Sequence, residues 1–187
     1  MAVTTLDPKT ALIVVDLQKG ILSRVDASVL SGVVKHAVTL LDAFRKHKLP
    51  VVLVNVTGVA PGRNEQPRMP ASFPAEFAEL IPELKQQPSD HLVTKRTWGA
   101  FTNTDLNDWL KKNGVTQVVV CGVATSAGVE STARFAQELG YNVTLATDAM
   151  TDMSPEAHEN SIKHIFPRLG ETGTTAEIVA LLDKRAA

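Results

Sequence analysis

Ala11-Leu-Ile-Val-Val-Asp16 decides the fold of this chain, because five apolar residues run without interruption into a carboxylate. Continuous β-branched runs of this kind are typical of strands that are buried on both faces of a parallel sheet. Similar runs recur along the chain. The predicted strands are Ala11–Val15, Val51–Val54, His91–Thr94, Val115–Val120 and Val143–Ala146.

Helical patterns lie between these runs. From Leu30 to Phe44, apolar residues recur at spacings of three and four, which marks one face of a helix. Other helices are predicted from Thr104 as N-cap to Gly114, from Val129 to Gly140, from Ser154 onward, and over Thr174–Lys184. This alternation predicts right-handed crossovers and a doubly wound α/β sheet.

Composition limits the class of protein. The 187 residues suit a single domain spanning 1–187, and hydrophobic and charged shares of 44% and 21% are ordinary for a globular protein. A net charge of −1 favours neither nucleic acid nor an anionic membrane as a partner. Met1–Thr10 lacks the features of a secretory signal, and no apolar run approaches the roughly 20 residues of a membrane span. We therefore expect a cytoplasmic protein.

One segment is irregular. Gly58–Pro74 contains four prolines and two glycines, and it is too polar and broken for a core element. We predict that it forms a long loop over a site.

Polar residues follow several of the predicted strands. In open parallel sheets, ligands bind where strands end. Asp16, Lys95, Asn55 and Thr57 all stand at such ends. Taken alone, Asp16 could cap the following turn and Lys95 could be an exposed loop lysine, but on neighbouring strands they could pair and tune each other's pKa.

A further strand end consists of small residues. Gly122–Val129 joins a valine-rich strand to a helix, and its backbone N–H groups could hold an anion or a developing oxyanion. The alternative is a tight turn without further function. The segment lacks both the P-loop and the dinucleotide-binding patterns.

Three motifs together resemble the isochorismatase-like superfamily of cysteine hydrolases. They are Asp16-Leu-Gln18, Thr94-Lys95-Arg96-Thr97-Trp98-Gly99-Ala100-Phe101, and Cys121-Gly-Val-Ala-Thr125 with Val129-Glu-Ser-Thr-Ala-Arg134. The tail from Thr147-Asp-Ala149 to Ile165-Phe166 fits as well. The resemblance implies a six-strand parallel sheet of order 3-2-1-4-5-6, a cis peptide before Ala124, a small-molecule substrate and a homo-oligomer (dimer or tetramer). It implies no cofactor.

The resemblance also implies a triad of Asp, Lys and Cys. Asp16 and Lys95 carry over, but the cysteine position falls on Gly128. Cys121, the single cysteine, is predicted to be a buried structural thiol. Asn55-Val-Thr57 stands where relatives with a metal would have Asp-x-His, so no metal site is expected.

Isochorismatase proper resembles this chain in having glycine at that position. The resemblance therefore favours cleavage of the vinyl ether of isochorismate to pyruvate and a dihydroxy-cyclohexadiene carboxylate. Asp16 would be the general acid, Lys95 would position it, and Gly128 would leave space for the substrate. Ala124 and Thr125 are predicted to contact the substrate through this turn.

Four further residues are candidates for substrate binding. Arg63 could clamp a substrate carboxylate or simply face solvent, and Gln18 could donate to the substrate or support the Asp16 turn. Trp98 and Phe101 could line the pocket or pack in the core.

His158 and His164, on a predicted helix, are interpreted as structural or solvated, and Glu130–Arg134 as an ion pair on one helix face.

Two other functions stay open. One is a related hydrolase that cleaves another small carboxylate or amide with Asp16, Lys95 and an activated water. The other is a catalytically silent binding protein on the same fold, against which retention of both charged residues argues.

Overall fold

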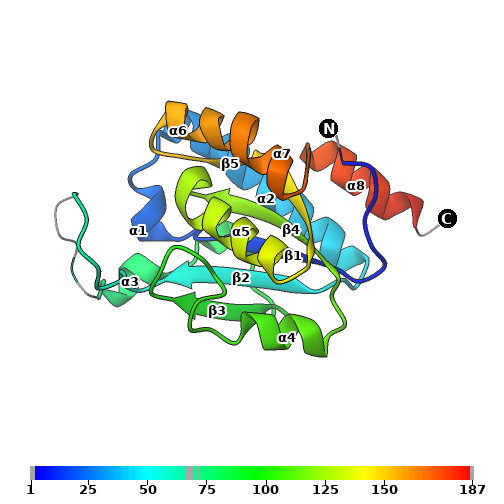
Figure 1. Cartoon of the computed structure of the whole chain (residues 1–187), viewed down its shortest axis with the longest axis horizontal. Coiled ribbons are helices and arrows are strands. Elements are labelled where there is room, and N and C mark those ends of the chain that lie inside the picture. The colour runs from blue at the N-terminus through cyan, green and yellow to red at the C-terminus, as the bar shows by residue number, and fades with distance from the viewer. Residues whose placement is uncertain (1–2, 66–69, 71, 186–187) are drawn as a thin grey trace.

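The structure is a computed structural model that describes residues 3–65, 70 and 72–185. Its centre is a six-stranded sheet of order β3-β2-β1-β4-β5-β6 in which every pairing is parallel. The strands are β1 (Thr10–Val15), β2 (Val51–Val56), β3 (His91–Lys95), β4 (Gln117–Val123), β5 (Asn142–Thr151) and β6 (Glu171–Gly173). The doubly wound α/β fold and its strand order are confirmed (Figure 1).

Each of the five predicted strands differs from the structure in at least one limit, and β4 is Gln117–Val123 instead of the predicted Val115–Val120. β2 continues to Val56 and β5 to Thr151, because pairing with a neighbouring strand persists beyond the last apolar residue of each run. β6 has only three residues, Glu-Thr-Gly, two of them half-buried. Such a short polar edge strand carries no apolar run, so only the family resemblance implied it.

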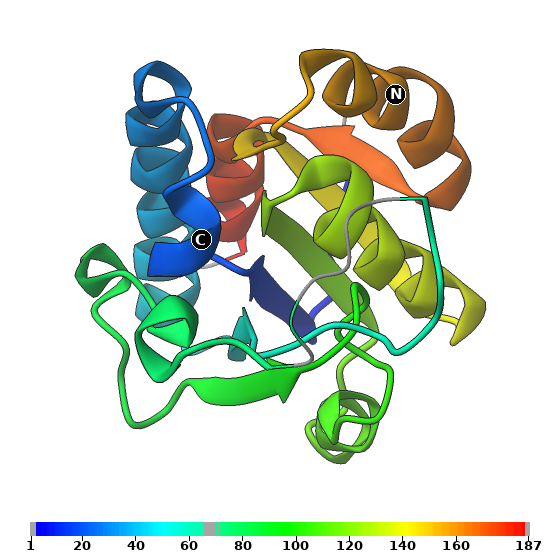
Figure 2. The ribbon, with the colours of Figure 1, turned by 90° about the vertical axis from the view of Figure 1, so that its left-hand side faces the viewer.

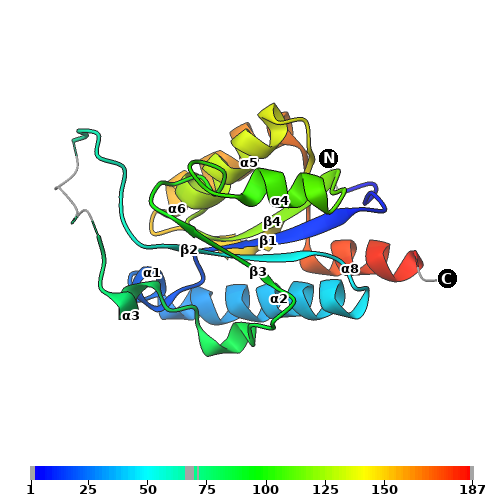
Figure 3. The same ribbon diagram turned by 90° about the horizontal axis from the view of Figure 1, so that it is seen from below.

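Helices cover both faces of the sheet, as Figure 3 shows. On one face lie α1 (Lys19–Leu22), α2 (Ala27–Lys46) and α8 (Thr175–Lys184), and on the other lie α4 (Leu106–Lys112), α5 (Glu130–Glu138) and α6 (Pro155–Asn160). The shorter elements are α3 (Ala75–Ala78), a 3₁₀ turn (Pro82–Leu84), two π-helical turns (Thr125–Val129 and Ser161–Ile165) and α7 (Phe166–Leu169).

The alternation of side chains along β1 builds two separate cores. Leu12 and Val14 pack in the cluster that includes α2 and α8, whereas Ile13 and Val15 pack in the cluster that includes α4 and α5. Every residue of β1 is buried, as expected for the central strand of a two-faced sheet.

α2 is long and apolar enough, by length and composition, to cross a membrane. Its apolar residues Ala37, Leu40, Leu41 and Phe44 are fully buried in the core beneath the sheet. That packing is the behaviour of a core helix.

The predicted helix starts at Ser154 and Thr174 are confirmed, and both residues are N-caps. Ser154 accepts a hydrogen bond from the N–H of Ala157, and Thr174 forms a capping box with Glu177. The predicted N-cap at Thr104 is displaced by one residue: Asp105 is the N-cap of α4, and Thr104 Oγ1 accepts from the N–H of Leu106 at 3.4 Å.

The Gly58–Pro74 segment begins and ends with backbone contacts between its two arms. Gly58 forms a bridge with Ser72, and the N–H of Phe73 donates to the carbonyl of Thr57. The segment leaves the edge at which the strands end (Figure 2), and in Figure 1 its described part stands away from the sheet. Pro67, one of the prolines behind the loop prediction, lies outside the described residues.

Candidate active site

Asp16 and Lys95 meet at the carboxyl edge of the sheet. Asp16 follows β1 and Lys95 ends β3, so Lys95 must reach past the intervening strand β2. Its Nζ lies 2.6 Å from Oδ2 of Asp16 and also donates to the carbonyl of Thr97 at 3.2 Å. Their side chains are only 1% and 6% exposed, so the predicted pair is a buried ion pair rather than a cap and a surface lysine.

Burial dominates the electrostatics of Asp16. Loss of hydration raises the pKa of its carboxyl to about 6, while the charge and the hydrogen bond of Lys95 oppose that rise. Its second oxygen, Oδ1, is buried and has no hydrogen-bond partner among the described residues. Because Oδ2 already accepts from Lys95, a proton on the carboxyl is best placed on Oδ1.

The backbone of Asp16 adopts a left-handed conformation, with φ of 51°. Non-glycine residues enter this region at a cost of about 1 kcal/mol, and aspartate tolerates it better than most. Two bonds hold the conformation: the N–H of Asp16 donates to Val54 in β2, and its carbonyl accepts from Gln18 at 2.8 Å. The chain therefore turns sharply where β1 ends and places the buried carboxyl beside Lys95.

The neighbouring turn from β4 to α5 lies against this carboxyl. Gly122, with φ of +121°, brings β4 so near β1 that a Cβ there would sit 2.0 Å from the carbonyl oxygen of Val15. The Val123–Ala124 peptide bond is cis, as the resemblance implies. Further along the turn, a Cβ built on Gly128 would lie 3.1 Å from Oδ2 of Asp16, so Gly128 directly adjoins the acid.

Some N–H groups of this turn are already engaged within the protein. Those of Ala127 and Val129 donate to the carbonyl of Ala124, and that of Ser126 donates to Asp152. A role in binding an oxyanion therefore falls to the other N–H groups of the turn.

Gln18 has no free amide group to offer a substrate. Its Nε2 donates to the carbonyls of Val56 and Phe77, and its Oε1 accepts from the N–H of Val56. The residue is fully buried. The structure therefore corrects its assignment as a substrate ligand: Gln18 supports the turn by joining it to β2 and α3.

The two predicted aromatic wall residues separate. Trp98 is 66% exposed, and its carbonyl oxygen lies 3.6 Å from a Cβ built on Gly128, which places it beside the site. Phe101 is buried in the core, where its ring stacks on Tyr141 at 6.2 Å, so its assignment to the pocket wall is wrong.

Arg63 is exposed on the Gly58–Pro74 segment and makes no hydrogen bond or ion pair with another described residue.

Thr125 is enclosed rather than open to a substrate. Its side chain is fully buried, and Oγ1 lies 2.8 Å from Nδ1 of His158 in α6. The next residue, Ser126, donates through both its N–H and its hydroxyl to Asp152. Sequence reasoning missed Asp152 and the contact of His158 with this turn, although Asp152 follows the end of a strand, which is the signal that identified Asp16.

The other two predicted strand-end residues, Asn55 and Thr57, form hydrogen bonds within the protein. Asn55 donates to the carbonyl of Ala78 and accepts from Thr94, and the N–H of Thr57 donates to the carbonyl of Lys95. Within the described part of the chain, no group of three His, Cys, Asp or Glu side chains could hold a metal.

Cys121 is fully buried in β4, as predicted, and its burial together with the negative charge of Asp148 raises the pKa of the thiol to about 12.

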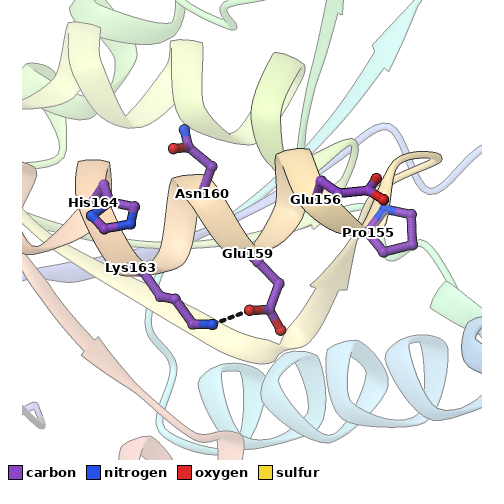
Figure 4. A pocket seen from close by; sticks show the side chains of 6 residues that line it. All are labelled: Pro155, Glu156, Glu159, Asn160, Lys163 and His164. Atoms are coloured by element: carbon purple, nitrogen blue, oxygen red, sulfur yellow. Dashed lines mark hydrogen bonds and ion pairs between the residues drawn. The ribbon is translucent and has the colours of Figure 1, made fainter.

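Two surface hollows lie elsewhere on the molecule. One is lined from α6 and the following π-helical turn by Pro155, Glu156, Glu159, Asn160, Lys163 and His164 (Figure 4). The other lies where β4 and β5 begin and includes Asp7, Gln117 and Tyr141. Neither includes Asp16 or Lys95, so these two hollows do not mark the candidate site, which the buried ion pair locates instead.

Fold and site define an enzyme-like α/β protein with its reactive groups at the carboxyl edge of a parallel sheet. The family model for the isochorismatase domain matches residues 10–177. An uncharacterized isochorismatase family protein of Bacillus subtilis, YwoC, is 44% identical over 91% of this chain and 93% of its own. Another from Escherichia coli O157:H7, YecD, is 41% identical over 92% and 96%.

A solved structure agrees with this relationship. The isochorismatase family protein from Burkholderia thailandensis is 40% identical and superposes with a TM-score of 0.90, covering 96% of this chain and 98% of that one. The chain therefore belongs to the isochorismatase family and is a hydrolase of that family.

Proposed function

We propose that this hydrolase cleaves the vinyl ether of isochorismate, with Asp16 as the general acid. The observation that carries the proposal is the buried carboxyl itself, whose pKa of about 6 leaves about a tenth of it protonated at pH 7, far more than for an ordinary aspartate. Lys95 holds Oδ2, so the proton on Oδ1 is free to be transferred.

Thiol chemistry is not open to this chain. Gly128, which we assign to the cysteine position of the family, has no side chain. Cys121, the single cysteine, is enclosed and its thiol stays protonated. A covalent thioester therefore has no nucleophile, and a reaction that needs only an acid and water fits the residues present.

The reaction balances with these groups. Asp16 transfers its proton to the terminal carbon of the enolpyruvyl group, which leaves an oxocarbenium ion. Water adds to that ion, and its released proton returns to the Asp16 carboxylate. The bond between the hemiketal carbon and the ring oxygen then breaks as the hemiketal hydroxyl proton is transferred to that oxygen, giving pyruvate and the dihydroxy-cyclohexadiene carboxylate. No cofactor or metal takes part.

Other residues are assigned by chemistry and position. Glycine at position 128 keeps the Asp16 carboxyl uncrowded, because a Cβ there would lie 3.1 Å from Oδ2, and we assign the enolpyruvyl group to the site beside this carboxyl. The N–H groups of Ala124 and Gly128 bind a substrate oxygen, Trp98 covers the substrate ring, and Arg63 pairs with a substrate carboxylate. The assembly as a homo-oligomer and the cytoplasmic location stay predictions.

Relatives support more than one substrate. A probable isochorismatase of Pseudomonas chlororaphis is 29% identical over 96% of this chain, and nicotinamidase 3 of Arabidopsis thaliana is 28% identical over 83%. The alternative is hydrolysis of another small carboxylate or amide in which Asp16 activates a water as a base. We favour the acid because a carboxyl with a raised pKa is suited to proton donation.

The third possibility, a catalytically silent binding protein, is disfavoured by the pair itself. A buried ion pair stabilises a fold little compared with apolar replacements, so its retention argues for use in catalysis.

The test is pyruvate release from isochorismate by the parent protein and by Asp16→Asn. Asp42→Asn, which removes an exposed carboxylate from α2, is the matched control. Turnover by the parent and the control, and its loss in Asp16→Asn with folding verified, supports the proposal. No pyruvate from the folded parent overturns it and directs the search to small amides and esters.

A further inference from the structure

The turn Thr125–Val129 is hydrogen-bonded to the segment that runs from the end of β5 into α6. Asp152 accepts from the N–H and the hydroxyl of Ser126 at 2.7 and 2.8 Å. His158 bonds Thr125 Oγ1 at 2.8 Å through Nδ1. Two consecutive residues of the turn are therefore fixed by side chains from one neighbouring segment.

A third hydrogen bond joins the same segment to the start of α5. Ser161 donates to Glu130 at 2.5 Å, and Glu130 directly follows the turn. His158 and Ser161 are three residues apart, so they project from one helix face. That face therefore holds both ends of the turn.

The same turn also adjoins Asp16. Gly128 adjoins Oδ2 of Asp16, and its carbonyl accepts from the hydroxyl of Thr132 at 2.7 Å. A displacement of the turn would alter both the space beside Asp16 and the exclusion of water from its carboxyl.

We propose that His158 is a positioning residue, which acts through Thr125 to fix the turn against Asp16. This inference rests on the proposed function for its kinetic consequence only. Thr125, His158 and Asp152 have the composition of a nucleophile–base–acid set, but the Thr125 side chain is fully buried and Asp152 bonds Ser126 and Ser154 instead. Positioning is therefore the role that the contacts support.

The test compares His158→Ala with His158→Asn, whose amide places a polar atom where Nδ1 lies. Thr125→Val removes the same hydrogen bond from the other partner with little change of shape, and it serves if His158→Ala does not fold. The control is His164→Ala, because His164 lies on the same helical stretch and is exposed (Figure 4).

Two quantities are measured in each variant: kcat and KM with isochorismate, and the pKa of Asp16 from the pH dependence of its carboxyl ¹³C signal. For His158→Ala and Thr125→Val we expect kcat to fall about tenfold or more with little change in KM. The pKa of Asp16 should fall from about 6 toward the ordinary value of 3.8, because water reaches the carboxyl. His158→Asn should restore both quantities, and His164→Ala should match the parent.

Unchanged kcat and an unchanged Asp16 titration in Thr125→Val or His158→Ala would overturn the inference, as would failure of His158→Asn to restore them. If the parent releases no pyruvate, the proposed function fails, while the titration of Asp16 still decides the positioning role.

Discussion

Replacing Asp16 with Asn should change how the stability of the protein depends on pH. In the folded protein the Asp16 pKa is about 6, above the ordinary value of 3.8 that applies when the chain is unfolded. Folding is therefore favoured while the carboxyl is protonated. This contribution is fully present below the unfolded pKa and is lost as the pH rises through the folded one.

The magnitude follows from the two pKa values. The difference between about 6 and 3.8, at about 1.4 kcal/mol for each pKa unit, corresponds to about 3 kcal/mol in the free energy of unfolding. About 2 kcal/mol of this falls between about pH 4.5 and about pH 7.5, because part is already lost at the lower pH. Asp16→Asn has no such proton and should not show this loss.

The assay is urea unfolding of the parent, Asp16→Asn and the control Asp42→Asn at those two pH values. Other carboxyls contribute equally to the parent and to Asp16→Asn, so the difference between the two proteins isolates Asp16. Asp16→Asn also leaves Lys95 without a charged partner, a state that the parent reaches below its Asp16 pKa of about 6, so the two proteins are compared by their pH dependence and not by absolute stability. If the single variant does not fold, Asp16→Asn with Lys95→Met removes both charges. Parallel pH dependences of parent and variant would refute the reasoning.

Three other substitutions or probes test separate parts of the structure. Gly128→Ala should lower kcat/KM about 100-fold, because its Cβ would lie 3.1 Å from Oδ2 of Asp16 and crowd the acid. Undiminished pyruvate release would contradict the need for glycine at this position. Gln18→Leu should lower the free energy of unfolding by about 3 kcal/mol or more, since it leaves the Val56 N–H and two carbonyls unpaired. A urea midpoint equal to that of the parent would argue against a role of Gln18 in supporting the turn after β1. Cys121 should resist iodoacetamide in the native protein and react after denaturation, and mass spectrometry of native protein that shows rapid alkylation would disprove its enclosure.

Apolar runs and their polar ends predicted most of the fold and the central pair. Asp16 and Lys95 were found because each ends a buried strand, and parallel strands bring their ends to one edge of the sheet. β6 escaped notice because three polar edge residues leave no hydrophobic pattern. Periodicity reports burial, and an edge strand with partly exposed residues lacks that signal.

The roles of individual residues around the site depend on contacts that cannot be read from the spacing of residues in the sequence. Gln18 and Phe101 were candidates because they lie close in sequence to Asp16 and Lys95. In the structure, Gln18 is hydrogen-bonded to backbone groups of the framework, and Phe101 is packed in the core. His158 reaches Thr125 across 33 residues of chain, so only the folded arrangement of α6 over the turn reveals the pair. Long-range hydrogen bonds of this kind have no local signature.

The pH dependence of kcat/KM for pyruvate release from isochorismate tests the central claim most directly. If protonated Asp16 is the acid in the free enzyme, kcat/KM should be constant below the Asp16 pKa of about 6 and should then fall about tenfold for each further pH unit. A value of kcat/KM that rises with pH through the same range would contradict the account, because the carboxylate would then act as a base.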